Sequence, residues 1–397
     1  MTKRAILTLL ALVTFVSGAS AQKERRVLLQ TQLEPLIEKT MRENHIPGFA
    51  IGIVENGKVI YAKGFGVAKL GDDKPITSKS LFHMASVTKP FVATAIMQLV
   101  ERGKVNLDAR VTEYLPYFRM KDERFATITV RQMLGHISGM PDIEDYQWDK
   151  PEYDDGALER YVRSLSELSL IARPGEKFQY SNMAFEILGD VIAKVSGGSF
   201  ESYVQRNILK PLGMNHSTLL IREANQKLLT SPHVTRGSGV IVSKVFPYNR
   251  AHAPSSTLYS NIDDMNRWAI ANLNRGKLSG RRILKASSYD LLWKAQMDAG
   301  RRGGIGLSWF LTKRNEHWIV YHGGSDIGFN SYIVLAPDNS ISIVAMSNFL
   351  PEKTGYASSI VNTALDMMLG EKVEAVKKGT QSIMPRSDEV STTARWY

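Results

Sequence analysis

The sequence contains no cysteine. This absence excludes disulfide bonds, thiolate metal sites, a cysteine nucleophile and the lipid-bearing cysteine of a bacterial lipoprotein. Nucleophilic chemistry in this chain must therefore use oxygen or nitrogen. The eight histidines show no metal-ligand spacing, and no His-Glu-x-x-His motif or carboxylate cluster is present. We expect neither a metal nor a cofactor.

The chain also lacks a basic tract, although its formal net charge is +11. Lysine and arginine are scattered, and pairs such as Arg281-Arg282 and Arg301-Arg302 stand alone. No nucleic-acid-binding module is recognisable, so we expect no nucleic-acid partner. With 43% hydrophobic and 22% charged residues, the composition is that of a folded protein with a full core.

No apolar run reaches the roughly 20 residues that a bilayer-spanning helix needs. The run at 5–16 follows Lys3 and Arg4 and precedes the small residues at 19–21. This pattern predicts a signal peptide at 1–21, and a membrane anchor is the alternative. We expect an exported protein, periplasmic or extracellular, without stable membrane insertion after cleavage.

Strand patterns occur near both ends of the chain. An Asn-Gly pair at 56–57 between two β-prone runs predicts a hairpin. Later strands are expected at 318–321, 330–335 and 341–346, and a helix at about 356–369. We expect an α/β fold at 22–370, with one sheet from about 45–80 and 300–350 and a helical insert at about 105–250. The tail at 371–397 is polar and aperiodic, and we expect it to be mobile.

Ser86-Val87-Thr88-Lys89 is a Ser-x-x-Lys motif at the start of a helix expected at about 86–102. The spacing places the hydroxyl and the amine on one helix face. The lysine can take the serine proton if burial or nearby cations lower its pKa from about 10.4. Ser20-Ala21-Gln22-Lys23 also matches, but only Ser86 opens an amphipathic helix after a strand-rich region. The context predicts Ser86 as the nucleophile.

Tyr180-Ser181-Asn182 follows a Pro-Gly turn and precedes a helix expected from Met183. A tyrosine here can move a proton between nucleophile and leaving group, and Asn182 can donate to a substrate amide carbonyl. The alternative is a half-buried tyrosine with an asparagine helix cap. A second copy, Tyr259-Ser260-Asn261, lacks the defined loop that favours Tyr180.

His322-Gly323-Gly324-Ser325 ends a predicted strand. Two glycines at such a place let a ligand approach the backbone closely. The backbone N–H of Ser325 would be a natural second oxyanion donor. Taken alone, the motif is better explained as a simple strand-ending turn with a surface histidine.

Together and in this order, these motifs resemble the serine β-lactamase-like, penicillin-recognising family. It includes class C β-lactamases, D-alanyl-D-alanine carboxypeptidases, D-aminopeptidases and related esterases. The resemblance covers about 34–369 and extends to 134–140, 211–214 and 256–264, the last of which accounts for the second Tyr-Ser-Asn. It implies a β-lactamase/transpeptidase-like fold, with an antiparallel sheet flanked by helices and the site between sheet and helical insert.

The resemblance also implies roles for single residues. Ser86 would be the nucleophile, and Lys89 and Tyr180 would handle protons. Asn182 and His322 would position substrate. The amides of Ser86 and Ser325, with Gly324 beside them, would form the oxyanion hole.

This chain departs from class C β-lactamases at the third motif, where they usually have Lys-Thr-Gly and it has His-Gly-Gly. With a histidine at this position, the chain is more similar to the carboxypeptidase and D-aminopeptidase branch than to class C β-lactamases. We therefore expect a secreted serine hydrolase that forms an acyl-enzyme with a peptidoglycan-like D-peptide or an ester. The alternatives are a class C-type β-lactamase and a non-catalytic penicillin-binding envelope protein.

Two further features have competing interpretations. The loop at 142–155 combines seven acidic residues with Tyr146, Trp148 and Tyr153. The resemblance implies that this loop lies near the site entrance, where it could select a cationic or bulky substrate. A solvated surface loop is the favoured interpretation. His136 is interpreted as a structural hydrogen-bonding residue rather than a base.

Overall fold

The computed structural model of the protein describes residues 23–143, 145–351 and 355–371. The expected signal peptide at 1–21 lies outside these residues, as does the expected mobile tail apart from Glu371. Within the described ranges, no helix is both long enough and apolar enough to cross a membrane.

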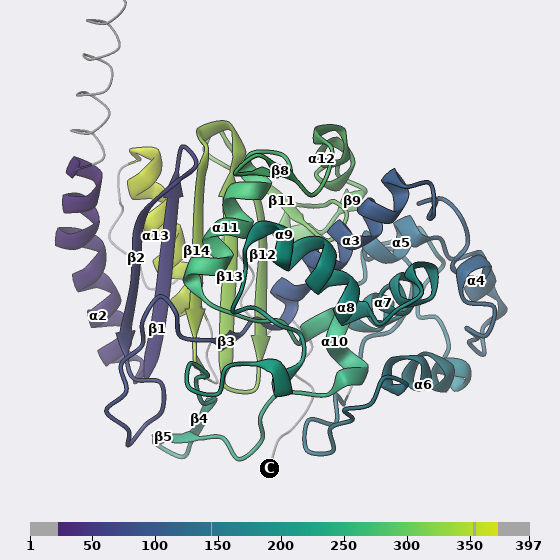
Figure 1. The fold of residues 1–397 in the computed structure, drawn as a ribbon, viewed down its shortest axis with the longest axis horizontal. Helices are drawn as coiled ribbons and strands as arrows, with labels where there is room; N and C mark the ends of the chain where they lie inside the picture. Colours follow the sequence, from purple (N-terminus) through teal and green to yellow (C-terminus); the bar gives the residue numbers. More distant parts are fainter. Residues whose placement is uncertain (1–22, 144, 352–354, 372–397) are drawn as a thin grey trace, which may run out of the picture.

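An eight-stranded antiparallel sheet forms the centre of the molecule (Figure 1), in the order β2-β1-β14-β13-β12-β11-β10-β9. Its strands are β1 (Gly48–Glu55), β2 (Lys58–Gly66), β9 (Met297–Asp298), β10 (Gly304–Ile305), β11 (Phe310–Arg314), β12 (His317–Asp326), β13 (Phe329–Ala336) and β14 (Ile341–Ser347). Because β1 pairs with β14, the two ends of the chain build one sheet. The expected fold is confirmed.

The Asn-Gly signal forms the turn between β1 and β2. Asn56 and Gly57 have φ values of 50° and 73°. Both residues tolerate this left-handed region, and a two-residue turn of this kind matches the twist of a hairpin.

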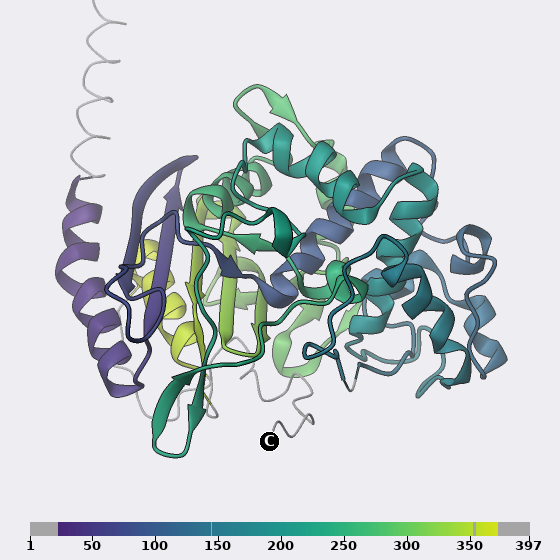
Figure 2. The same ribbon diagram turned by 60° about the horizontal axis from the view of Figure 1, so that its bottom comes forward.

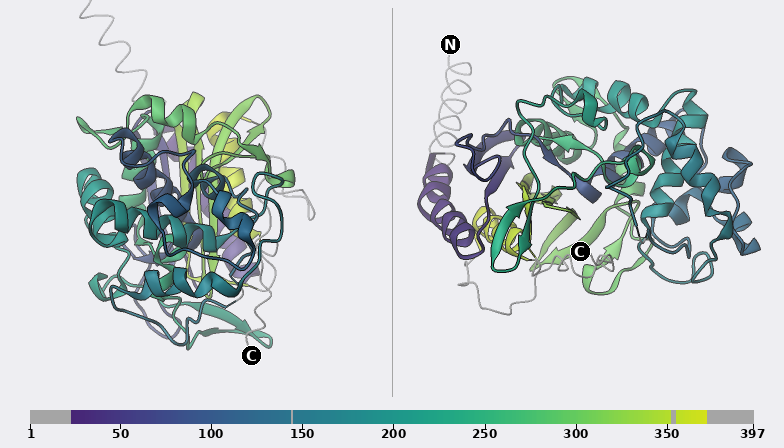
Figure 3. Two further views of the ribbon diagram at one scale, coloured as in Figure 1. Left: turned by 90° about the vertical axis from the view of Figure 1, so that its right-hand side faces the viewer. Right: turned by 90° about the horizontal axis from the view of Figure 1, so that it is seen from below.

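Alternate residues of the central strands face two separate cores. On β1, Phe49, Ile51 and Ile53 contribute to one core, while Ala50 contributes to the other. This division follows from the two-residue period of a strand. The first core is closed by η1 (Leu29–Leu33), α2 (Glu34–Glu43) and α13 (Tyr356–Leu369), which lie side by side on one face (Figures 1 and 3).

The opposite face carries α11 (Ile262–Leu273) and the helical part of the chain. That part contains α3 (Lys89–Glu101), α4 (Val111–Tyr114), α5 (Val130–Leu134), α6 (Ala157–Ser164), α7 (Asn182–Ser196), α8 (Phe200–Val204), η5 (Gln205–Leu209), α9 (Lys210–Leu212) and α10 (Ala253–Ser256). α12 (Ala286–Leu292) follows α11. The helices gather at the side of the sheet where β12 and β11 lie (Figure 1).

A hairpin interrupts the expected helical insert. β4 (His233–Arg236) and β5 (Gly239–Val242) pair with each other, and β4 also pairs with β15 (Phe349–Leu350). The hairpin extends away from the body of the protein (Figure 2). Its strands are only four residues long, too short for a periodic pattern to show in the sequence.

Candidate active site

Ser86 lies in a tight turn immediately before α3. The 3-10 turn η2 (Ala85–Thr88) holds it, so the α-helix itself begins at Lys89 rather than at Ser86. Ala85 has a φ of 47°, an unfavourable left-handed value for a residue with a Cβ. Met84 fixes the turn from outside, since its N–H donates to Leu258 O at 2.8 Å and its carbonyl accepts from Ser331 Oγ at 2.6 Å.

Lys89 is fully buried beside Ser86. Its Nζ lies 3.0 Å from Ser86 Oγ and donates to the carbonyl of Ser255 at 2.9 Å. The rings of Tyr180 and Phe185 lie 5.2 and 5.6 Å from the same nitrogen. The structure therefore brings the expected nucleophile into contact with the expected base.

Tyr180 lies in the loop before α7 and is held by His136. The two rings stack with centroids 4.2 Å apart. His136 also accepts from the N–H of Ser181 through Nδ1, at 3.1 Å, and from the N–H of Gln179 through its carbonyl, at 2.8 Å. These bonds agree with the interpretation of His136 as a structural residue, and they show that it orients the Tyr180 loop.

Asn182 is 3% exposed, and most of its donors are already used. Its N–H and its Nδ2 both donate to Asp142 Oδ1, at 2.7 and 2.8 Å. A hydrogen bond donated by this side chain to substrate would therefore use the second hydrogen of Nδ2. Ser181, not Asn182, is the side chain that caps α7, through a bond from the N–H of Ala184.

His322 lies inside a strand and not at its end. β12 continues to Asp326, and His322 pairs in register with Ile333 of β13. The strand end expected at Tyr321 was too early because two consecutive glycines weaken a strand pattern. The pairing of β11 with β12, however, does stop at Tyr321. Beyond that point the edge of β12 contacts η2, which carries Ser86.

Gly323 and Gly324 make close contacts within the protein. A Cβ on Gly323 would stand 2.8 Å from the Tyr332 ring, and one on Gly324 would stand 2.8 Å from Ser86 N. The glycines thus let β12 approach its neighbours, whereas the sequence pattern had suggested the approach of a ligand. Ser325 follows on the same edge, and its Oγ accepts from Asn330 at 2.6 Å.

His322 is a buried and neutral group, so its interpretation as a surface histidine is wrong. It is 1% exposed, and its Nδ1 lies 2.7 Å from the Gly323 carbonyl. Burial first, and the charge of Lys89 second, lower the pKa of His322 to about 3. The same causes hold the pKa of His136 well below its ordinary value. Two neutral imidazoles therefore flank Lys89.

The loop at 142–155 is only partly solvated. Trp148 is 3% exposed, Tyr146 stacks on it with centroids 4.6 Å apart, and Asp142 points inward to Asn182. Exposed positions include Asp145, Asp149, Asp154 and Asp155. The interpretation as a solvated surface loop is therefore correct for these four residues and wrong for Trp148 and Asp142.

The second Tyr-Ser-Asn motif is a structural part of the core. Tyr259 is buried in β6 (Tyr259–Ser260), where its hydroxyl donates to Pro247 O at 2.9 Å. Asn261 caps α11 through a bond from the N–H of Asp264. Their side chains are therefore committed to the fold. The second Ser-x-x-Lys motif begins at Ser20, which lies outside the described residues.

Several residues at the site were missed by sequence reasoning. Ser255 holds Lys89, and the guanidinium of Arg302 lies 5.6 Å from the Tyr180 ring. Asp326 accepts hydrogen bonds from Ser256 and His83 directly after Ser325. None of these has a local motif. Glu186 does have a signal, because it is an acidic residue within an apolar stretch of α7.

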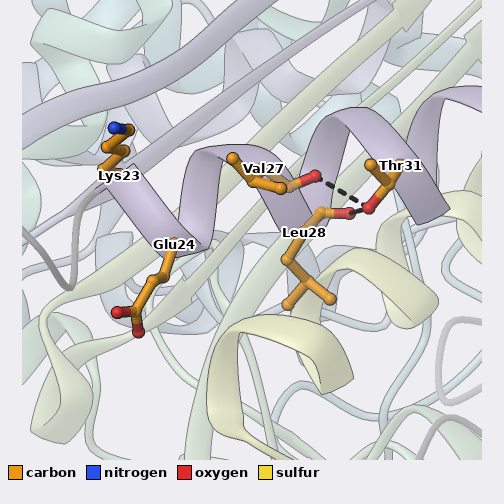
Figure 4. Close-up of a pocket in the computed structure, with 5 residues that line it drawn as sticks. All are labelled: Lys23, Glu24, Val27, Leu28 and Thr31. Carbon is orange, nitrogen blue, oxygen red and sulfur yellow. Dashed lines mark hydrogen bonds between the residues drawn. The ribbon is translucent and has the colours of Figure 1, made fainter.

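Across the described part of the chain, no group of three or more His, Cys, Asp or Glu residues is arranged to hold a metal ion. A surface pocket that does not include Ser86 lies at the first turns of the N-terminal helix (Figure 4). It is lined by Lys23, Glu24, Val27, Leu28 and Thr31. The Thr31 hydroxyl donates to the backbone of its own helix, so this pocket shows no arrangement suited to acyl transfer.

The antiparallel sheet, the flanking helices and the Ser-Lys contact at their junction define a serine hydrolase of the β-lactamase/transpeptidase-like fold class. The chain belongs to the Beta-lactamase family, whose model matches residues 33–365. It is an enzyme of the serine hydrolase type found in that family.

Relatives and solved structures agree with this assignment. The chain is 31% identical to protein flp of Staphylococcus aureus strain MW2 over 340 residues, which are 85% of this chain and 66% of flp. It is 28% identical to penicillin-binding protein 4 of Amycolatopsis lactamdurans over 344 residues, covering 83% of this chain and 86% of that protein. The chain thus spans slightly less than two thirds of flp.

Among solved structures, the octameric penicillin-binding protein homologue from Pyrococcus abyssi is similar, with a TM-score of 0.77 and 28% identity. The match covers 86% of this chain and 77% of that one. EstCE1, described as a hydrolase with promiscuous acyltransferase activity, has a TM-score of 0.70 at 22% identity, over 81% of this chain and 94% of its own. The second match bears on the fold alone.

Proposed function

We propose that this chain hydrolyses D-peptides or esters through an acyl-enzyme on Ser86. The observation that carries the proposal is the 3.0 Å contact between Ser86 Oγ and the buried Nζ of Lys89. A lysine in this position can accept the serine proton as Oγ attacks a carbonyl carbon. The bond between Oγ and the carbonyl carbon forms first and places negative charge on the carbonyl oxygen; the bond to the leaving group then breaks, and the acyl group remains on Oγ.

The remaining groups suit the later steps. The backbone N–H groups of Ser86 and Ser325 would hold the oxyanion, since Gly324 allows β12 to lie against the Ser86 turn. Tyr180, next to Lys89, would pass the proton to the leaving nitrogen or oxygen. Water would then attack the acyl-enzyme, giving the acid product and restoring Ser86. Asn182 and His322 would position the substrate.

The choice of a D-peptide or ester over a β-lactam rests on His322. A neutral imidazole supplies no fixed positive charge for the carboxylate of a β-lactam antibiotic, unlike the lysine of Lys-Thr-Gly. The relatives called penicillin-binding proteins make a peptidoglycan-like D-peptide a reasonable substrate class. A class C-type β-lactamase is the second candidate.

The test is a panel of p-nitrophenyl esters, D-amino-acid peptides and the chromogenic cephalosporin nitrocefin. We expect turnover of an ester or a D-peptide and only slow hydrolysis of nitrocefin. A nitrocefin rate typical of a resistance enzyme would overturn the substrate assignment. Ser86→Ala should abolish both turnover and covalent labelling by a fluorophosphonate, and turnover retained in this variant would overturn the mechanism.

A non-catalytic penicillin-binding protein is the remaining alternative. The contact between Lys89 and Ser86, with the Tyr180 ring near the same amine, argues against it, because a binding protein has no use for proton transfer. Stoichiometric labelling of Ser86 without turnover of any panel substrate would favour it.

Export is part of the proposal and rests on the signal-peptide pattern at 1–21. A periplasmic or extracellular enzyme would meet peptidoglycan-like substrates directly. N-terminal sequencing of the protein recovered from the periplasm or medium should start near Gln22. An uncleaved protein in the cytoplasm would contradict export and leave the acyl-enzyme mechanism untouched.

A further inference from the structure

A carboxylate with no place in the proposed mechanism is fully buried behind Lys89. Glu186 lies on α7 and has no exposed surface. It accepts hydrogen bonds from the hydroxyl and the N–H of Ser255, the latter at 3.2 Å, and it lies 3.3 Å from His252 Nδ1. A buried carboxylate is costly, so such a residue needs either a structural or a functional reason.

The same Ser255 provides the carbonyl that accepts from Lys89 Nζ at 2.9 Å. Glu186 accepts hydrogen bonds from two groups of Ser255, its N–H and its Oγ, and these bonds fix the orientation of Ser255. The chain of contacts runs from Glu186 through Ser255 to the amine that touches Ser86. One residue therefore separates the buried carboxylate from the proposed base.

We infer that Glu186 is a positioning residue for Lys89: it holds the Ser255 carbonyl in place and thereby aims Nζ at Ser86 Oγ. The inference rests on the proposed role of Lys89 and names a residue that acts on it.

Other charged and titratable groups lie near Lys89 and Glu186. Lys89 is surrounded by His136, His322, Asp142 and Tyr180. Burial keeps the two histidines neutral near pH 7. Glu186 is surrounded by His252, Tyr146 and Tyr161.

The experiment measures how fast a fluorophosphonate labels Ser86 as its concentration is raised, without requiring the natural substrate. In Glu186→Gln one of the two acceptor oxygens becomes an amide nitrogen, which cannot accept from Ser255. The maximal labelling rate should therefore fall about tenfold, while the half-saturating fluorophosphonate concentration stays near that of the wild type.

Glu186→Asp separates geometry from charge. The aspartate keeps the carboxylate, but its side chain is one methylene shorter and cannot accept both hydrogen bonds from Ser255. The maximal labelling rate should then also fall about tenfold, although the charge is kept. A maximal rate equal to that of the wild type would overturn the positioning role.

Glu201→Gln is the matched control. Glu201 is another buried carboxylate, 7% exposed, but it is paired with Arg250 at 2.8 Å rather than with Ser255. This variant should lower the melting temperature without changing the maximal labelling rate. If Glu186→Gln behaves in the same way, the inference is wrong and Glu186 is only structural.

Ser255→Ala keeps the inference testable if Glu186→Gln does not fold. It removes the hydroxyl that Glu186 holds and leaves the carbonyl that binds Lys89. A labelling rate reduced severalfold in a folded protein supports the inference, and an unchanged rate overturns it. Labelling that persists in Ser86→Ala would instead overturn the proposed function.

Discussion

Gly324 lies directly against the backbone of Ser86. A Cβ on Gly324 would stand 2.8 Å from Ser86 N and 2.5 Å from Met84 O, closer than real Cβ atoms approach such neighbours. The strand β12 can therefore reach the nucleophile turn only if this residue is glycine. The contact also determines how the two proposed oxyanion donors, the amides of Ser86 and Ser325, lie relative to each other.

Gly324→Ala should reduce labelling of Ser86 by a fluorophosphonate about 100-fold or more, because the added methyl group separates the two donors. The measurement is the second-order labelling rate, with the melting temperature to confirm folding. Gly239→Ala on β5 is the control, since a Cβ there would find its nearest atom at 4.0 Å. Wild-type labelling in Gly324→Ala would contradict the role of this contact.

The sequence predicted the contacts and elements that form between residues close together in the chain. Ser86 and Lys89 are three residues apart, so their contact follows from the path of one helical segment. The turn at Asn56 and the helix α13 at Tyr356–Leu369 likewise depend on neighbouring residues and were expected with nearly the observed bounds.

Contacts between distant segments could not be predicted in this way. Asp142 is 40 residues from Asn182, and Glu186 is 69 residues from Ser255. Such pairs form because helices and loops of the insert pack onto one edge of the sheet, and no spacing in the sequence records that packing. The burial of His322 has the same origin, because its neighbours Lys89 and Phe310 come from other elements.

Asp142→Ala should lower kcat/KM for an ester or D-peptide about tenfold. The substitution leaves the two donors of Asn182 without their acceptor, a loss of about 1 to 3 kcal/mol for a buried group, and the asparagine side chain is no longer oriented.

Asp142→Asn is the matched control, because its Oδ1 can accept the same two bonds without the charge. Its kcat/KM should stay within about twofold of the wild type, since neutral hydrogen bonds replace the charged ones. Equal losses in Asp142→Asn and Asp142→Ala would show that the charge, not the hydrogen bonding, is what matters at this position.

His322 should make the protein less stable in acid. Its pKa, lowered to about 3 mainly by burial and next by Lys89, lies far below the roughly 6.5 of a histidine in the unfolded chain. The unfolded state therefore binds more protons below pH 6.5, and the free energy of unfolding decreases as the pH falls toward 3. Between pH 7 and pH 5 the contribution of this residue is about 2 kcal/mol.

Urea unfolding of His322→Gln at pH 7 and pH 5 measures this contribution. The loss of unfolding free energy on acidification should be smaller than that of the wild type by about 2 kcal/mol, since glutamine does not titrate. His136, whose pKa burial also lowers, is present in both proteins and cancels from the comparison. His45→Asn is the control: His45 is exposed with a φ of 53°, which asparagine tolerates. Its acid sensitivity should match the wild type, and an equally steep loss in His322→Gln would show that His322 takes up a proton in the folded protein.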